Sequence, residues 1–137
     1  MRFPKPHALA TVLGLALASG AMAQETSDVK FAPGNFGTMV SGKITGQDYI
    51  DYRLGANAGQ EMFVELSVTD STGNGTVYFN ILPPGSDGVA IYNASMDGNS
   101  TTITLPDSGT YAIRVYHMGN DEDSGKTSSF NVDLSIQ

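Results

Sequence analysis

The stretch Glu61-Met62-Phe63-Val64-Glu65-Leu66-Ser67-Val68-Thr69 decides the fold class of this 137-residue chain. Met62, Val64, Leu66 and Val68 point to one side of it, and the residues between them point to the other. A period of two is typical of a β-strand with one buried face, whereas an amphipathic helix repeats its apolar residues every three or four positions. Residues 61–69 are therefore interpreted as a half-buried strand.

The same alternation recurs on both sides of this strand. In residues 110–116, Tyr111, Ile113 and Val115 share one face, and Tyr111 is interpreted as a core aromatic whose hydroxyl needs a partner. Gln24–Asp28 is polar and is expected to form a loose N-terminal arm. Further strands are expected at residues 29–31, 38–44, 48–54, 77–82, 89–92, 101–105 and 129–137.

Turn-forming segments separate the expected strands. Residues 70–75 tolerate positive φ, and residues 83–88 cannot continue a ladder because proline has no N–H. No stretch has helical apolar spacing of useful length. The sequence predicts an all-β fold: a single antiparallel β-sandwich of about eight or nine short strands, with jelly-roll-like or Ig-like topology, forming one domain over residues 24–137.

Residues 1–23 predict a secretory signal peptide. Arg2 and Lys5 precede the apolar run at residues 8–18, which is shorter than the ~20 residues of a membrane span. Ala21-Met22-Ala23 fits a signal peptidase site, so we expect cleavage after Ala23 rather than an uncleaved anchor. The expected protein is exported and does not insert into a membrane.

The charge balance and the cysteine count exclude several classes of function. The signal holds two of the seven basic residues, so residues 24–137 carry five against all 14 acidic ones, a net charge of −9. Such a chain is repelled by nucleic acid phosphates and by anionic lipids. With no cysteine, a disulfide framework, a thiolate nucleophile and a cysteine-based metal site are excluded.

Residues 24–137 offer little catalytic chemistry. Their single histidine, His117, follows the 110–116 strand and is interpreted as a surface residue at a strand end rather than as a general base. A Gly-x-Ser-x-Gly elbow and a phosphate-binding glycine loop are both missing. We expect no enzyme activity and no cofactor, with a hydrolase using paired carboxylates as a remote alternative. A binding role carried by loops is favoured.

An acidic run lies in the longest gap between expected strands. Asp121, Glu122 and Asp123 are weak Ca²⁺ candidates, because Ca²⁺ prefers oxygen ligands. The alternating pattern of an EF-hand loop is missing, so a solvated turn is the favoured interpretation and no metal site is assigned.

Several stretches together carry a resemblance to one family. They are Ser41-Gly42-Lys43-Ile44-Thr45-Gly46-Gln47-Asp48-Tyr49-Ile50-Asp51-Tyr52, then Ala58-Gly59-Gln60, then Leu105-Pro106-Asp107-Ser108-Gly109-Thr110-Tyr111-Ala112-Ile113-Arg114-Val115, and a C-terminal set of Asn120-Asp121, Gly125-Lys126-Thr127 and Phe130-Asn131-Val132-Asp133-Leu134-Ser135-Ile136. In this order, from Val29 to the end, the chain resembles the bacterial periplasmic inhibitors of g-type (goose-type) lysozyme.

The resemblance implies a non-catalytic β-sandwich in the periplasm that blocks the cleft of g-type lysozyme, or binds another secreted protein, through protruding loops. The implied loop candidates are Gln47, Tyr49, Met118, Gly119, Asn120, Asp121 and Asp123. It also implies basic and aromatic contact residues, since arginine binds carboxylates with two parallel hydrogen bonds. Residues 118–124 contain no arginine, and Gln47 stands where the inhibitors can offer an aromatic. Asp121 is interpreted as a residue that fixes the loop.

Part of the pattern is shared with another class of sandwich. The Gly-x-Asp-Tyr stretch at Gly46, the Ala-Gly-Gln at Ala58 and the Ser-Gly-x-Tyr at Ser108 are similar to bacterial pre-peptidase C-terminal domains. That resemblance implies an accessory binding module for glycan, Ca²⁺ or another protein, and it is the alternative function.

Overall fold

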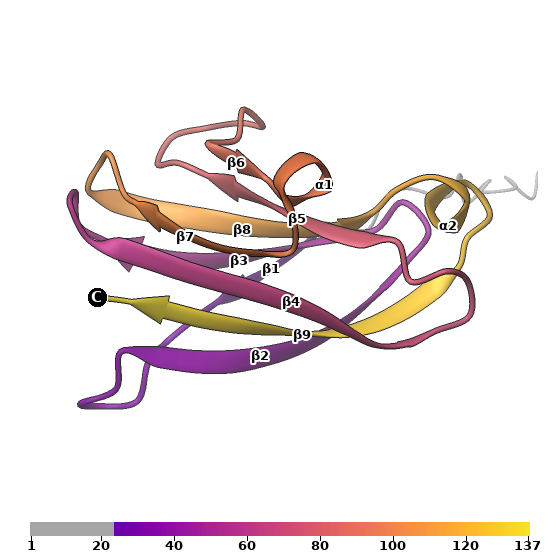
Figure 1. Ribbon diagram of the computed structural model, residues 1–137, viewed down its shortest axis with the longest axis horizontal. Coiled ribbons are helices and arrows are strands. Elements are labelled where there is room, and N and C mark those ends of the chain that lie inside the picture. Colours follow the sequence, from indigo (N-terminus) through magenta and orange to yellow (C-terminus); the bar gives the residue numbers. More distant parts are fainter. Residues whose placement is uncertain (1–23) are drawn as a thin grey trace, which may run out of the picture.

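A computed structural model describes residues 24–137, so the expected signal peptide and its cleavage site lie outside the described residues. Within that range the chain forms nine strands and two one-turn helices (Figure 1). The elements are β1 (Gln24–Asp28), β2 (Gly37–Thr45), β3 (Tyr49–Ala56), β4 (Glu61–Ser71), β5 (Val77–Leu82), β6 (Tyr92–Asn93), α1 (Ala94–Asp97), β7 (Ser100–Thr104), β8 (Gly109–His117), α2 (Asn120–Asp123) and β9 (Thr127–Ile136).

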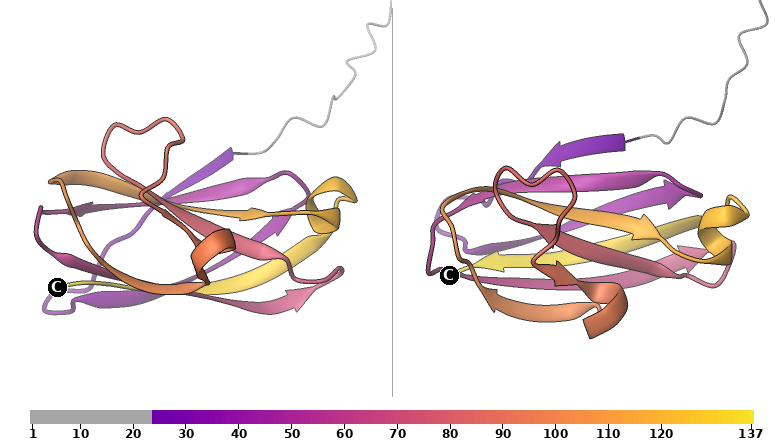
Figure 2. Two further views of the ribbon diagram at one scale, coloured as in Figure 1. Left: turned by 45° about the horizontal axis from the view of Figure 1, so that its top comes forward. Right: turned by 90° about the horizontal axis from the view of Figure 1, so that it is seen from above.

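The strands form two sheets that pack face to face (Figure 2). The five-stranded sheet has the order β1-β3-β8-β5-β6, and the four-stranded sheet has the order β2-β9-β4-β7. The predicted β-sandwich is confirmed. All pairings are antiparallel except β1 with β3, which is parallel.

Strand β1 corrects the expected loose arm. Its residues pair in register with β3, from Gln24 opposite Tyr49 to Asp28 opposite Arg53. Four of its five side chains are exposed, so its sequence has no alternation of apolar and polar residues that would predict a strand. The pairing satisfies backbone groups along the β3 edge, and that benefit does not depend on the side chains.

Three other local expectations also need correction. Residues 29–31 are not a strand, although the Val29 N–H continues the ladder by donating to the Arg53 carbonyl at 2.8 Å. The strand expected at 89–92 is reduced to Tyr92–Asn93, and Val89 is exposed. Helices α1 and α2 are single turns, too short to produce a helical period in the sequence.

The core lies between the sheets and is made by the alternating faces that the sequence predicts. In β4 these are Met62, Val64 and Leu66, all buried. Val68 leaves the pattern and is exposed, and the pairing of β4 with β9 becomes irregular directly after it, between Val68 and Asp70. Across residues 24–137, neither helix has the length or apolar composition to span a bilayer.

The predicted core role of Tyr111 is confirmed. Its side chain is fully buried, and its hydroxyl donates to the Asp107 carbonyl at 2.6 Å and accepts the Asp107 N–H at 3.1 Å. The hydroxyl therefore closes the turn before β8 from the inside.

Tyr111→Phe should lower the free energy of unfolding by about 1–2 kcal/mol, because the Asp107 backbone groups lose their buried partner. Urea denaturation measures the change. Tyr116→Phe is the control, since the Tyr116 hydroxyl bonds the side chain of Asn80 rather than backbone groups of a turn, and Tyr116 is only half-buried. Equal losses in both variants would contradict the role given to Tyr111.

Candidate functional site

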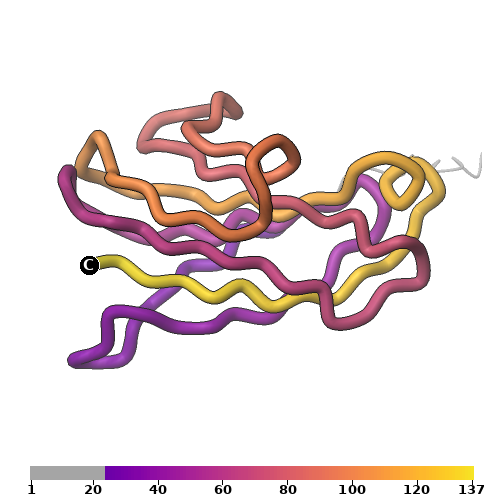
Figure 3. Tube along the Cα trace, in the orientation of Figure 1, coloured from indigo at the N-terminus to yellow at the C-terminus, as the bar shows by residue number. Residues whose placement is uncertain are grey.

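Three connections gather at the end of the sandwich opposite the C-terminus (Figures 1 and 3). They are the β2–β3 turn at residues 45–48, the β4–β5 loop at 72–76 and the β8–β9 loop at 118–126. We call this region the loop end. It carries every loop candidate that the sequence singled out, except that Tyr49 begins β3.

The β2–β3 turn places Gln47 at an exposed tip. Gly46 has φ 57°, and the Asp48 N–H donates to the Thr45 carbonyl at 3.0 Å. Positive φ at the first central residue alone fits a type II′ turn, which favours glycine there, and here the turn leads from one sheet to the other. The buried Gly46 N–H donates to the Lys126 carbonyl at 2.8 Å, so this turn is bonded to the β8–β9 loop.

His117 is buried, 1% exposed, and corrects the expected surface position. Its side chain lies on the same buried face of β8 as those of Tyr111, Ile113 and Val115. Its Nδ1 lies 3.1 Å from the Gly46 carbonyl, which can only accept, so Nδ1 carries a hydrogen. This bond ties the end of β8 to the β2–β3 turn.

The other ring nitrogen of His117 extends the network to two more strands. Nε2 lies 2.8 Å from the hydroxyl of buried Ser128, and that hydroxyl lies 2.9 Å from the Ser71 hydroxyl. Ser71 Oγ also accepts the N–H groups of Gly73 and Gly75. One hydrogen-bonded chain therefore joins β8, β9, the end of β4 and the β4–β5 loop.

Asp121 connects the β8–β9 loop to the β4–β5 loop. Its buried carboxylate accepts the Asn74 N–H at 2.9 Å and the Thr76 N–H at 2.8 Å. Gly73 packs directly on it, because a Cβ there would overlap the carboxylate. Hydrogen bonds from Asn74 and Thr76 lower the pKa of Asp121 against the opposing effect of burial, and nearby His117 lowers it slightly. These hydrogen bonds support the interpretation of Asp121 as a residue that fixes the loop.

The burial of Asp121 corrects the expected solvated turn and argues against the Ca²⁺ set. Its oxygens already hold two backbone N–H groups. Glu122 is half-buried, and only Asp123 of the three is exposed. Among residues 24–137, no group of three or more histidine, aspartate or glutamate side chains is placed to hold a metal ion.

A cavity of about 400 Å³ lies beside these loops. Gln47, Tyr49 and Met118 all line it, together with Glu122, so the fold brings three of the predicted candidates together. Gly119, Asn120 and Asp123 are exposed but do not line it. The cavity floor includes Arg114, from β8.

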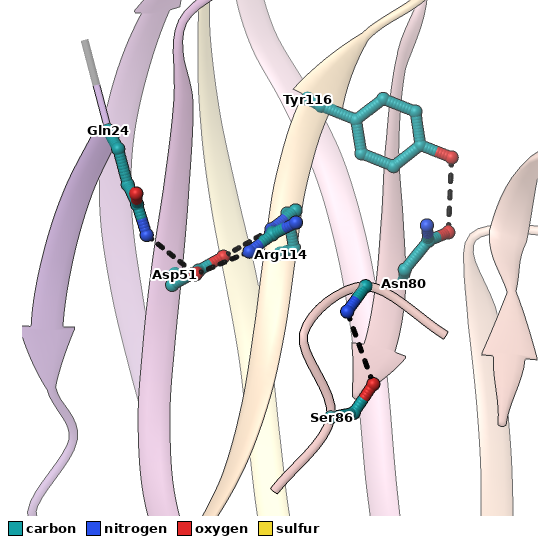
Figure 4. Close-up of polar contacts among 7 residues, drawn as sticks. Gln24, Asp51, Asn80, Ser86, Arg114 and Tyr116 are labelled. Atoms are coloured by element: carbon teal, nitrogen blue, oxygen red, sulfur yellow. Dashed lines mark hydrogen bonds and ion pairs between the residues drawn. The ribbon is translucent and has the colours of Figure 1, made fainter. Parts of the chain in front are cut away.

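Sequence reasoning missed Arg114 and its partner Asp51. The Arg114 guanidinium donates to both Asp51 oxygens, at 2.8 and 3.0 Å (Figure 4). It also lies 4.4 Å from the centre of the Tyr49 ring. The hydrogen bond to Asp51 raises the pKa of Arg114. The alternation of apolar and polar residues predicts which face of its strand each residue occupies. Whether the two side chains meet depends on the β3–β8 register, which no local sequence pattern reveals.

The fold and the loop end define a class: a small β-sandwich that presents internally braced loops at one end. No established protein-family profile matches the chain. It is 32% identical over 129 residues, 92% of each chain, to a protein of Escherichia coli (strain K12) described as an inhibitor of g-type lysozyme. This chain belongs to the family of inhibitors of g-type lysozyme.

Solved structures agree with this assignment. The crystal structure of Aeromonas hydrophila PliG, a periplasmic lysozyme inhibitor of g-type lysozyme, covers 85% of this chain and 100% of its own length, with a TM-score of 0.76 and 33% identity. The pre-peptidase C-terminal domain of a Bacillus anthracis collagenase covers 85% and 96%, with a TM-score of 0.54 and 13% identity. That second likeness shows the fold alone, so the accessory-module alternative is not favoured.

Proposed function

We propose that this protein is a periplasmic inhibitor of g-type lysozyme that acts by binding and not by catalysis. The observation that carries the proposal is the family relationship, 32% identity over 92% of both chains to an inhibitor of g-type lysozyme. The chain supplies its own support in the loop end, where buried polar groups fix three connections in one arrangement. Loops that are already ordered lose less entropy on binding.

The proposed contact surface is built around the 400 Å³ cavity. Gln47, Tyr49 and Met118 form its centre, because they meet there and because tyrosine and methionine are enriched at interfaces. Exposed Gly119, Asn120 and Asp123 extend it along the β8–β9 loop. Asp121 is not a direct contact, since it is buried.

The charge of this surface differs from that expected of an arginine-based inhibitor. Glu122 and Asp123 occupy the β8–β9 loop, and residues 118–124 contain no arginine. This surface therefore suits lysozyme groups that are basic or that donate hydrogen bonds. With −9 on residues 24–137, attraction to a basic partner should make the association rate fall as salt rises.

Purified residues 24–137 should protect peptidoglycan from g-type lysozyme when inhibitor and enzyme are present at about equal concentrations. Met118→Asp should weaken inhibition by about tenfold or more, because a charge enters the centre of the interface. Ile91→Asp is the matched control, since Ile91 is 41% exposed and Met118 38%, and Ile91 lies outside the loop end. Absence of protection at large molar excess would refute the function. Equal weakening by both variants would refute the surface.

A further inference from the structure

The outer face of the five-stranded sheet carries two rows of side chains that run across the strands. The first is a tyrosine row, in which Tyr116 of β8 lies between Tyr49 of β3 and Tyr78 of β5. The second is a polar row one pleat further on, in which Arg114 lies between Asp51 and Asn80. These residues are on the face away from the core, because alternate residues of β3, β8 and β5 are the buried ones. Asp51 is nevertheless only 6% exposed.

Contacts between the rows hold them in fixed positions (Figure 4). Arg114 is bidentate to Asp51 and lies over the Tyr49 ring. The Tyr116 hydroxyl donates to Asn80 Oδ1 at 3.1 Å. The bond to Tyr116 leaves the Asn80 NH₂ group available, and the outer edge of Arg114 is partly exposed, so both keep hydrogen-bonding capacity for a ligand. Asp51 instead positions Arg114, since it is buried and its Oδ2 also accepts from Gln24 Nε2 at 3.4 Å.

Two cavities make this face concave. The larger, about 520 Å³, lies between Gln24 of β1 and the loop that follows β5, which rises from the sheet (Figure 2). It shares Tyr49 and Arg114 with the 400 Å³ cavity beside the loop end. Both volumes fall within the ~300–1,000 Å³ of small-molecule sites. We call the combined hollow the outer-face groove.

The charges of the groove indicate the class of ligand. Arg53 and Arg114, the only arginines of residues 24–137, both line the larger cavity. Two carboxylates, Asp51 and Asp87, line the same cavity and balance them. A balanced set of donors and acceptors suits a neutral ligand rich in hydroxyl groups more than it suits an ion. Tyrosine rings offer flat apolar surface to the C–H faces of sugar rings, and planar carboxylate, amide and guanidinium groups match neighbouring hydroxyls.

We propose that the outer-face groove binds an oligosaccharide, with sugar rings on Tyr49 and Tyr116 and hydroxyls on Arg114 and Asn80. This site goes beyond the proposed inhibition, since it takes a different ligand and needs no lysozyme. The groove shares Tyr49 and the 400 Å³ cavity with the proposed lysozyme surface, so a bound glycan and bound lysozyme would compete for it.

The test uses ¹⁵N-labelled residues 24–137 titrated by NMR with N,N′,N″-triacetylchitotriose and, in a second arm, with cellotriose. The two probes separate a requirement for acetamido groups from general hydroxyl recognition. Up to about 10 mM of each probe detects binding with a Kd of about 1 mM. Saturable shifts concentrated on β3, β8 and β5 are expected from at least one probe.

Two variants and a matched control locate the site. Tyr49→Leu and Asn80→Ala should each weaken binding by about tenfold or more while keeping a folded spectrum. Phe63→Leu removes a half-buried aromatic from the outer face of the other sheet and should leave binding unchanged. The proposal is overturned if neither sugar causes shifts, if the shifts lie elsewhere, or if Phe63→Leu weakens binding equally. Shifts of these rows by g-type lysozyme but by no sugar would also overturn it, by showing a protein interface.

Discussion

Asp121→Asn should lower the melting temperature of residues 24–137 by about 5–10 °C and should weaken lysozyme inhibition together with it. The amide is close in size to the carboxylate but directs an NH₂ group at backbone donors. The Asn74 and Thr76 N–H groups would then lose their charged acceptor in a buried site. Gly73 packs on the same carboxylate, so the change also alters a close contact of the β4–β5 loop.

Asp123→Asn is the matched control, because it makes the same change of charge two residues away on an exposed side chain. Its melting temperature should stay within about 2 °C of the wild type. Differential scanning calorimetry measures both variants. If the two variants had the same melting temperature, the Asp121 carboxylate would not be stabilising the β4–β5 loop.

The same residue predicts how stability depends on pH. The folded pKa of Asp121 lies below the ordinary value of 3.8, so the unfolded chain binds its proton first as the pH falls. Its stabilisation is therefore complete above pH 3.8 and is lost as the pH falls through the folded pKa. Wild type and Asp121→Asn should differ in melting temperature at pH 7 and converge in strong acid. A difference that stayed constant down to the lowest pH would contradict this assignment.

The fold was predictable because one face of most strands is buried. Residues 61–66 of β4, residues 111–117 of β8 and all of β9 alternate between core and surface, and that alternation is visible in sequence. β1 was missed for the opposite reason, since it is held at a sheet edge by backbone pairing and carries mostly exposed polar residues. The sequence did contain one unused signal: His117 is in phase with Ile113 and Val115, which indicates an inward position.

The candidate site was less predictable because it depends on contacts between distant segments. The sequence located Gln47, Tyr49 and Met118, and the fold brings them to one cavity. The partners of His117 and of Asp121 come from the β2–β3 turn, from β9 and from the β4–β5 loop. Strand order and register determine which of these residues come into contact, and neither can be predicted from a local sequence pattern.

His117→Ala should lower the free energy of unfolding by about 2–4 kcal/mol. The change leaves a cavity where a fully buried ring stood and removes both of its hydrogen bonds, to Gly46 and to Ser128. The β2–β3 turn would then lose one of its ties to the neighbouring loops, so lysozyme inhibition should weaken even where the variant is folded. Urea denaturation and the inhibition assay measure the two effects separately.

Two further variants divide the His117 effect into packing and hydrogen bonding. His117→Phe refills the volume but leaves the Gly46 carbonyl and the Ser128 hydroxyl without the ring nitrogens, so its stability should fall between those of alanine and histidine. Met118→Ala, at the adjacent exposed position, should change stability by only about 0.5 kcal/mol. If His117→Phe restored full stability and full inhibition, packing alone would explain the buried ring. The loop end would then owe its arrangement to Asp121 and the backbone bonds of Gly46, and not to the histidine network.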